Sequence, residues 1–138
     1  MERTFAIIKP DAVGRGLAGD IIKRIEQAAL KIRGMRLLHL SLPQAERFYE
    51  VHKARPFYGS LCEYMSSGPV VVMALEADGA IAKWRDLMGA TDPAKAAPGT
   101  IRKEFGMDVE KNATHGSDAP ETAAREVAFF FSSLDIVA

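Results

Sequence analysis

Residues 112–118 contain the side chains of this chain that are best suited to chemistry. His115 lies there among small residues, between a strand-like run and a helix that begins near Pro120. A histidine gains or loses its charge near neutral pH, so its ring can serve as an acid, a base or a nucleophile. Gly116 follows it and allows a backbone or a substrate to approach closely. We therefore predict that His115 lies in a loop that meets a ligand.

The last predicted helix, over residues 120–132, offers His115 a partner. Its apolar stripe runs through Val127 and Phe130, and Glu126 lies at the border of that stripe. From this border the carboxylate can hold one ring nitrogen of His115 and leave the other free to attack, as in other activated nucleophiles. The alternative is a carboxylate solvated at the surface, and the spacing alone favours that alternative.

Two other histidines are alternatives to His115. His39 lies on the polar face of a predicted strand, where solvent exposure is expected. His52 shares a helical stripe with Phe48 and Tyr49, so its ring can point inward. On such a stripe, a core histidine with satisfied hydrogen bonds is more common than a catalytic one.

Residues 14–19 formally match the dinucleotide-binding pattern G-x-G-x-x-G. That pattern requires glycines directly after a strand and an acidic residue about 20 positions further on. Here the first glycine lies several residues beyond Ile8, and residues 38–40 are not acidic, so the match is expected to be accidental. Because the chain also lacks a Walker-type loop, side chains must hold any bound phosphate. The basic candidates, each with surface solvation as its alternative, are Lys9, Arg55, Arg85 and Arg102.

Composition predicts one globular domain over residues 1–138. Hydrophobic residues make up 48% and charged residues 26%, which excludes a disordered chain. The formal net charge is zero, so no broad nucleic-acid footprint is expected. The single cysteine, Cys62, excludes an intrachain disulfide framework and a cysteine-based zinc site. The chain has no long apolar run, and we expect a cytoplasmic protein without membrane contact.

The hydrophobic pattern predicts an α+β fold. Strands are expected over residues 3–8, 38–42 and 70–75. A helix with apolar residues from Ile21 to Ile32 is expected to end at Gly34. Further helices are expected over residues 43–53, 58–66, 79–88 and 120–132, with a long loop over residues 89–106 that holds one helical turn near Ile101. This order fits a ferredoxin-like β-α-β-β-α-β fold, in which a four-stranded antiparallel sheet is covered by helices on one face.

Several motifs together resemble those of the nucleoside diphosphate kinase family. Residues 112–118, Asn-Ala-Thr-His-Gly-Ser-Asp, resemble the active-site signature of that family. The other motifs with a family resemblance are residues 3–11, 55–57, 67–71, 88–93 and 98–102. The resemblance covers essentially the whole chain, and separate motifs in the right order are more specific than any one alone.

The resemblance implies a role for each matching side chain near the reacting atoms. His115 would be the nucleophile that carries the phosphoryl group. Glu126 would orient its ring, with help from Ser117. Lys9 and Tyr49 would contact the phosphates or the sugar of the nucleotide.

The resemblance also implies the residues that hold the rest of the nucleotide. Phe57 would stack on the base. Arg85, Thr91 and Arg102 would hold phosphates, and Asn112 would hold the ribose. Stacking on one aromatic ring suits every base, so broad tolerance of base and sugar is expected.

The reaction that the resemblance implies takes place in two steps at one site. A nucleoside triphosphate would phosphorylate His115 and leave as a diphosphate, and a second nucleoside diphosphate would then take the group. Mg²⁺ would be carried by the nucleotide phosphates rather than by a protein cage, with Asp118 reaching it through water. Members of the family form homo-oligomers. Because the chain stops soon after Phe131, a tetramer is favoured over a hexamer.

The chain differs from the kinase family in two respects, and two other functions are alternatives to the kinase. Ala12 stands where many members of the family have glycine, and the chain lacks the longer C-terminal tail of some members. One rival is a dinucleotide-binding oxidoreductase fragment, which requires the glycine run to bind a ligand. The other is a ferredoxin-like interaction domain without catalytic activity.

Overall fold

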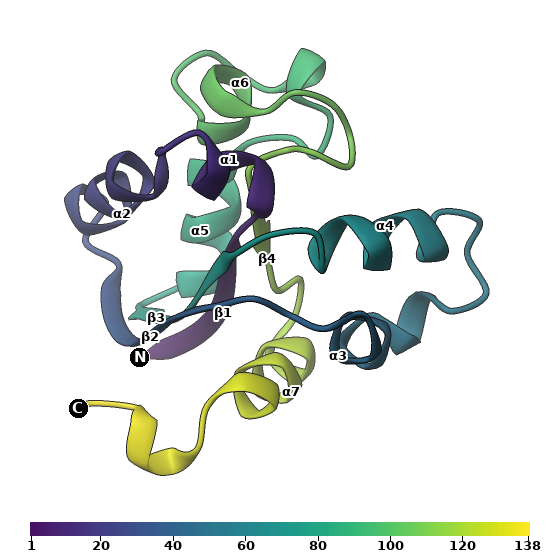
Figure 1. Cartoon of the computed structure of the whole chain (residues 1–138). Coiled ribbons are helices and arrows are strands. Elements are labelled where there is room, and N and C mark those ends of the chain that lie inside the picture. Colours follow the sequence, from purple (N-terminus) through teal and green to yellow (C-terminus); the bar gives the residue numbers. More distant parts are fainter.

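An antiparallel sheet forms the centre of the computed structural model, which describes residues 1–138 (Figure 1). Its four strands are β1 (Glu2–Ile8), β2 (Lys31–Leu38), β3 (Val70–Ala77) and β4 (Thr114–Gly116), in the order β2-β3-β1-β4 across the sheet. Each neighbouring pair is antiparallel. The predicted α+β class with a four-stranded antiparallel sheet is therefore confirmed.

Seven helices surround the sheet. They are α1 (Pro10–Gly14), α2 (Ala18–Gln27), α3 (Leu42–Phe48), α4 (Tyr58–Met65), α5 (Ala80–Met88), α6 (Ile101–Phe105) and α7 (Pro120–Phe130). Short 3₁₀ turns span Glu50–His52, Pro93–Lys95 and Ser133–Asp135. The helices over α4, α5 and α7 and the helical turn near Ile101 agree with the sequence prediction. Three elements were not predicted at their positions, namely α1, β2 and β4.

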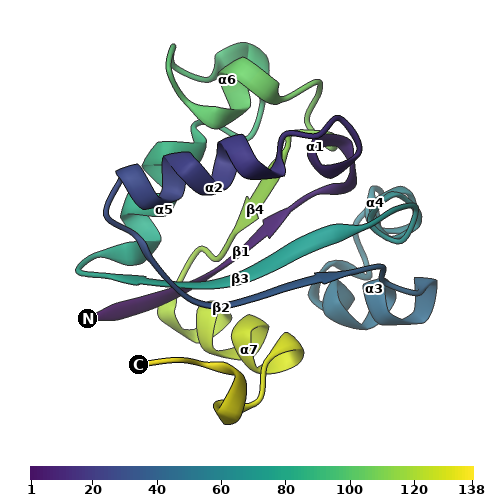
Figure 2. The ribbon, with the colours of Figure 1, turned by 60° about the vertical axis from the view of Figure 1, so that its left-hand side comes forward.

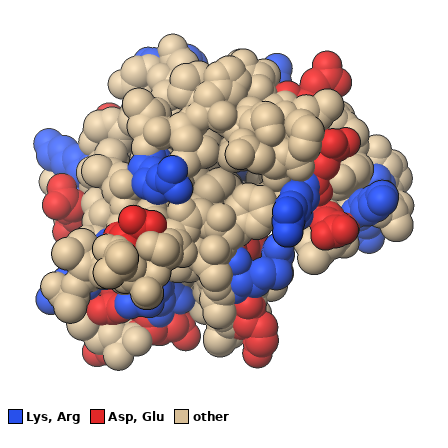
Figure 3. Space-filling model, turned by 60° about the horizontal axis from the view of Figure 1, so that its bottom comes forward, with Lys and Arg blue, Asp and Glu red and all other residues tan.

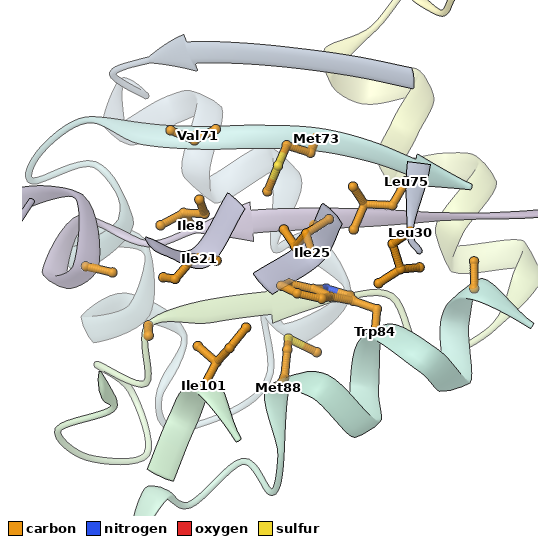
Figure 4. Close-up of a cluster of buried hydrophobic side chains, with 14 of the residues drawn as sticks. Ile8, Ile21, Ile25, Leu30, Val71, Met73, Leu75, Trp84, Met88 and Ile101 are labelled. Atoms are coloured by element: carbon orange, nitrogen blue, oxygen red, sulfur yellow. The ribbon is translucent and has the colours of Figure 1, made fainter. Parts of the chain in front are cut away.

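Helices cover both faces of the sheet, whereas we expected them on one face. In Figure 2, α2 and α5 lie on one side of the sheet and α7 lies on the other. The side chains of β1 divide accordingly, because successive residues of a strand point to opposite faces. Ile8 packs with Ile21 of α2 and Trp84 of α5, and these residues belong to the core that Figure 4 shows. Ile7 packs in a second core with Phe130 of α7.

Burial on both faces explains the composition of the two central strands. In β3, every residue except Glu76 is buried, and the same holds for β1 from Thr4 to Ile8. Strands that are covered on both sides are continuously apolar rather than alternating. The run at residues 70–75 was therefore predicted correctly as a central strand.

The chain carries equal numbers of basic and acidic side chains. No helix of the chain has the length and apolar character needed to cross a membrane. On the face shown in Figure 3, basic and acidic side chains lie interspersed over a largely uncharged surface. The glycine run at residues 14–19 begins at the last residue of α1, so a helix separates it from β1, and it ends in the first turn of α2. It therefore lacks the strand-to-helix geometry of a dinucleotide-binding loop.

The predicted helix over residues 21–32 is wrong in its second half. The helix α2 ends at Gln27, and Ile32 and Gly34 belong to β2. The chain leaves the helix at Ala29, which has a left-handed backbone with φ of 60°. Glycine is the usual residue at this position, so an alanine there gives no signal for a helix end. The apolar residue Ile32 continues the helical spacing without belonging to the helix.

The predicted strand over residues 38–42 is also wrong. The strand β2 ends at Leu38, and α3 begins at Leu42. Ser41 caps this helix, since its hydroxyl accepts a hydrogen bond from the Gln44 backbone N–H at 3.2 Å and its own N–H donates to the Gln44 side chain at 2.9 Å. The alternating leucines hid this capping box, because Leu40 is buried just beyond the end of the strand.

The left-handed alanine leads to a stability prediction. Ala29→Gly should raise the free energy of unfolding by about 1 kcal/mol, because an L-residue is strained in this conformation and glycine is not. The side chain of Ala29 is exposed, so its removal costs little burial. The neighbouring control, Ala28→Gly, should lower stability, since Ala28 has φ of −82° at the end of the helix. Thermal unfolding at matched protein concentration compares the two, and a less stable Ala29→Gly variant would contradict the prediction.

Candidate active site

His115 lies in β4 rather than in the predicted loop. It pairs with Ile7 of β1, and its side chain is 21% exposed. The prediction missed this strand because β4 has only three residues and its partner lies more than 100 positions away in the chain. The pairing places the histidine at the edge of the sheet, where a backbone of fixed register carries the imidazole.

A buried carboxylate holds one side of the His115 ring. Glu126 on α7 accepts a hydrogen bond from His115 Nε2 at 3.1 Å and another from the Ser117 hydroxyl at 2.8 Å, both on Oε1. Glu126 is only 6% exposed, so the solvated alternative favoured by its spacing is wrong. Ser117 is itself fixed, because the Phe5 backbone N–H donates to its oxygen at 3.3 Å.

The charge of Glu126 determines which nitrogen of His115 is free. Burial disfavours the ionised carboxylate, but the hydrogen bonds from His115 and Ser117 outweigh this cost and lower the pKa of Glu126. An ionised carboxylate can only accept hydrogen bonds, so Nε2 must carry the ring proton. The lone pair of the neutral ring therefore lies on Nδ1.

Aromatic rings pack around the imidazole. Their centroids lie 5.8 Å (Phe48), 6.1 Å (Phe5) and 6.3 Å (Tyr49) from that of His115, and all three meet it edge-on. The Tyr49 hydroxyl is buried and has no hydrogen-bond partner within the protein. Burial, reinforced by the charge of Glu126, raises the pKa of Tyr49, which keeps the hydroxyl neutral. A buried hydroxyl without a partner is available to a ligand.

Lys9 carries a positive charge in the same region, and the burial of that charge is energetically costly. Its ammonium group is buried and donates to Asn112 Oδ1 at 2.8 Å and to the Glu110 carbonyl at 3.2 Å. Burial, together with repulsion by Arg102, lowers the pKa of Lys9 to about 8. The surface alternative is therefore wrong for Lys9. An anion bound nearby would compensate the buried charge.

Asn112 joins Lys9 to the long loop. Its amide nitrogen donates to the carbonyls of Thr91 and Val109, both at 3.0 Å, and its oxygen accepts from Lys9. All of its polar atoms are thus engaged within the protein. The fixed amide sets the position of Thr91 relative to Lys9.

A cationic cleft lies beside α6. Its volume is about 490 Å³, and its lining includes Arg85, Thr91, Lys95 and Arg102. Arg102 is buried, and its guanidinium donates to the carbonyls of Gly89 at 3.0 Å and Thr114 at 2.8 Å. Burial and the nearby charge of Arg85 lower the pKa of Arg102 to about 10. Repulsion between like charges favours the binding of an anion in this cleft.

Phe57 and the other histidines lie outside this cleft. Phe57 is 42% exposed in the loop before α4, where its ring contacts that of His52 at 5.6 Å and the guanidinium of Arg55 at 5.8 Å. His52 is half-buried and stacks on Tyr49 at 6.4 Å. His39 is exposed, as expected. Phe57 is therefore accessible for stacking, whereas His52 contacts only aromatic neighbours of the site.

Asp11 was not among the predicted site residues, and it shapes the chain just before His115. Ala113 is fully buried in a left-handed conformation with φ of 73°. The Asp11 carboxylate accepts a hydrogen bond from the Ala113 N–H at 3.2 Å, and its other oxygen accepts from the Tyr64 hydroxyl. This conformation costs an L-residue about 1–2 kcal/mol, and the bond to Asp11 helps to offset it. No local signal in the sequence marks the turn, because alanine rarely adopts it.

The fold and these groups define a class of protein: enzymes that transfer a phosphoryl group through a histidine. The family model for nucleoside diphosphate kinase matches residues 2–136. A nucleoside diphosphate kinase of Trichlorobacter lovleyi is 63% identical over 99% of both chains, and one of Geotalea daltonii is 60% identical over 99% of this chain and 100% of the relative. The chain therefore belongs to the nucleoside diphosphate kinase family, and it transfers phosphoryl groups between nucleotides through a phosphohistidine.

Solved structures agree with this assignment. The Aquifex aeolicus nucleoside diphosphate kinase superposes with a TM-score of 0.96 at 45% identity and covers 99% of both chains. The Halobacterium salinarum enzyme, solved in complex with CDP, superposes with a TM-score of 0.95 at 42% identity over 99% of this chain and 91% of that one. The ferredoxin-like fold and the kinase resemblance are both confirmed.

The buried hydrogen bond to His115 predicts the effect of changing Glu126. Glu126→Gln keeps the shape of the side chain but removes its charge, so it should lower turnover by on the order of 10²–10⁴. Nucleotide affinity should be nearly unchanged, because Glu126 lies behind the ring. Steady-state rates and the Kd for ADP provide the two measurements. A rate reduced by less than threefold would show that this charge contributes little to the reaction.

The lowered pKa of Lys9 predicts a pH dependence of binding. Anions bind the protonated amine, so affinity for ADP should fall as the pH rises above about 8, by up to about tenfold per unit. Without ligand, the free energy of unfolding should change in the opposite direction. Below about pH 8 the charged, buried Lys9 destabilises the folded state, and this cost disappears as the pH rises from about 8 toward 10.5, the ordinary pKa of lysine. Calorimetry from pH 7 to 9.5 measures the affinity. Lys9→Met is the control, with weaker but pH-independent binding in this range, and a flat wild-type profile would contradict the prediction.

Proposed function

We propose that His115 is the residue that carries the phosphoryl group and that Nδ1 is the attacking atom. The observation that carries this proposal is the hydrogen bond between Nε2 and Glu126, which leaves Nδ1 with its lone pair. In the first step a bond forms between Nδ1 and the terminal phosphorus, and the bond from that phosphorus to the bridging oxygen breaks. The nucleoside diphosphate leaves with the bridging oxygen. In the second step a terminal oxygen of another diphosphate attacks the phosphorus, and the N–P bond breaks.

Glu126 and Ser117 support the charge that develops during attack. Bonding at Nδ1 makes the ring positive, and the Glu126 carboxylate stabilises that charge through the Nε2 proton. Ser117 donates to the same carboxylate oxygen and so holds it in place. The neutral Tyr49 hydroxyl lies beside the ring and has a proton to donate to the transferred phosphoryl group.

Arg85, Thr91 and Arg102 would hold the phosphates in the cationic cleft, while Lys9 contributes its buried charge from the other side of Asn112. The side chain of Asn112 would meet the ribose where it now meets Lys9. Phe57 would stack on the base, since its ring is accessible. Stacking on an aromatic ring suits the face of every base, so we expect broad tolerance of base and sugar.

Mg²⁺ fits this site as an ion that the nucleotide carries. When bound, it would neutralise part of the charge of the phosphates. No group of three or more His, Cys, Asp and Glu side chains is placed to hold a metal. A carboxylate close to His115 is that of Asp118, whose pKa is lowered by its hydrogen bond from Thr122 and by the charges of Arg85 and His115. The exposed Asp118 carboxylate would reach the ion through water.

We also propose a homotetramer in the cytoplasm. The strand β2 forms one edge of the sheet, and two large apolar side chains are exposed on it, Met35 (53%) and Leu37 (70%). An exposed apolar edge strand is suited to pairing with another chain, and most soluble oligomers are symmetric. Sedimentation equilibrium at several concentrations separates the tetramer from a hexamer or a monomer.

The two-step mechanism predicts that His115→Ala abolishes transfer and that His52→Ala leaves most of it. His115 has the buried carboxylate partner, whereas His52 contacts only aromatic rings. Initial rates at varied donor and acceptor should give parallel lines, and γ-labelled ATP should leave an acid-labile label on the His115 peptide. Intersecting lines or a label on another peptide would overturn the assignment.

A further inference from the structure

Trp84 of α5 contacts the backbone that carries the nucleophile. Its indole Nε1–H donates to the carbonyl oxygen of His115 at 3.1 Å. Trp84 is fully buried, and Figure 4 shows its ring between α5 and the sheet. This is the only tryptophan of the chain, and its sole polar atom is used in this bond. None of the catalytic roles described above includes it.

The ring lies behind the imidazole, on the other face of the sheet. Trp84 belongs to the core with Ile8 and Met88, whereas the rings around His115, those of Phe5 and Phe48, belong to the opposite core. The indole therefore cannot touch a phosphate bound at Nδ1. Any effect it has on the reaction must pass through the position of the His115 backbone.

Gly116 makes this close approach possible. A Cβ atom at Gly116 would lie 2.6 Å from the Cδ1 atom and 2.7 Å from the Nε1 atom of Trp84. The same Cβ would lie 2.6 Å from the terminal methyl of Met88. The indole thus occupies the space that a side chain after the histidine would fill. We predicted that this glycine admits a backbone or a substrate, but the group that approaches it is Trp84.

The backbone of β4 is held by its ladder to β1, which continues on either side of the strand through the bonds from Lys9 N–H to the Ala113 carbonyl (2.8 Å) and from Ser117 N–H to the Phe5 carbonyl (3.2 Å). The strand has three residues and lies at the end of the sheet, so only β1 pairs with it. Beside His115, the carbonyl of Thr114 accepts a hydrogen bond from Arg102 at 2.8 Å. Two side chains from two helices, Trp84 from α5 and Arg102 from α6, therefore fix consecutive carbonyls of this short strand.

The helix α5 also carries a residue of the cationic cleft. Arg85 follows Trp84 directly, is exposed and lines the cleft together with Arg102. A helix is stiff over one residue, so the bond from Trp84 to His115 sets the distance between the nucleophile and Arg85. Errors of about 1 Å in such a distance can reduce a rate by on the order of 10².

We propose that Trp84 is a positioning residue for phosphoryl transfer, which fixes the backbone of His115 relative to the phosphate-binding arginines. The proposal rests on the proposed role of His115. Trp84 acts on the geometry of attack and not on nucleotide binding. Its loss should therefore reduce the rate of transfer to His115 and leave affinity for ADP unchanged.

An isostere separates the hydrogen bond from the packing of the ring. β-(3-Benzothienyl)alanine has the shape of tryptophan with sulfur in place of the N–H group, so at position 84 it should preserve burial and remove the donor. The rate of His115 phosphorylation by Mg-ATP, measured in a single turnover, should fall about fivefold, the worth of one net hydrogen bond. The Kd for ADP and the unfolding temperature should stay close to those of the wild type. Trp84→Phe is a comparison that adds a cavity and should also lower the unfolding temperature.

A spectroscopic measurement tests the same contact in the unchanged protein. The single indole gives one ¹H–¹⁵N signal, which should move when His115 is phosphorylated, because the carbonyl it binds belongs to that residue. An isostere with the wild-type rate would overturn the proposal, as would a rate that falls only together with ADP affinity. A wild-type protein that takes its label elsewhere than on His115 would instead refute the proposed function.

Discussion

The site depends on one buried charge, the carboxylate of Glu126. An apolar environment disfavours an ionised carboxylate, and the hydrogen bonds from His115 and Ser117, together with the nearby charge of Arg125, keep it charged. Because the carboxylate can only accept, it fixes the ring proton on Nε2 and the lone pair on Nδ1. Its place on α7 requires that the helix pack on β1, which brings His115, the proposed nucleophile, and its partner together from 11 positions apart.

The cations of the site are also buried, although water solvates a positive charge better than the protein interior does. Lys9 and Arg102 are both buried, and burial lowers the pKa of each. Neither is paired with a carboxylate, since their hydrogen bonds go to carbonyl and amide oxygens. The folded protein thus holds positive charge that polyanionic phosphates can stabilise. A site of this kind binds its substrate through charge that is already in place and needs no reorganisation at the moment of reaction.

The sequence was sufficient for those parts of the fold that have a local signal. The central strand β3 follows from its apolar run, and the helices α5 and α7 follow from the hydrophobic pattern. The end of α2 could not be predicted, because an alanine takes the left-handed position at which glycine is expected. The strand β4 could not be predicted either, since its pairing with β1 is a contact across the whole chain. The position of Glu126 at the border of its apolar stripe allowed both a partner of His115 and a solvated carboxylate; the spacing favoured the solvated one, whereas the family resemblance indicated the partner.

The two faces of the sheet contribute to the nucleophile in different ways. On one face, Glu126 and the aromatic rings fix the orientation of the imidazole. On the other face, Trp84 fixes the carbonyl of the same residue, and Gly116 leaves the space that the indole needs. An edge strand pairs with one neighbour only, so backbone hydrogen bonds hold β4 from a single side. Placing β4 between two cores solves this problem, because each core immobilises a different part of His115 while the edge of the sheet stays open to the nucleotide.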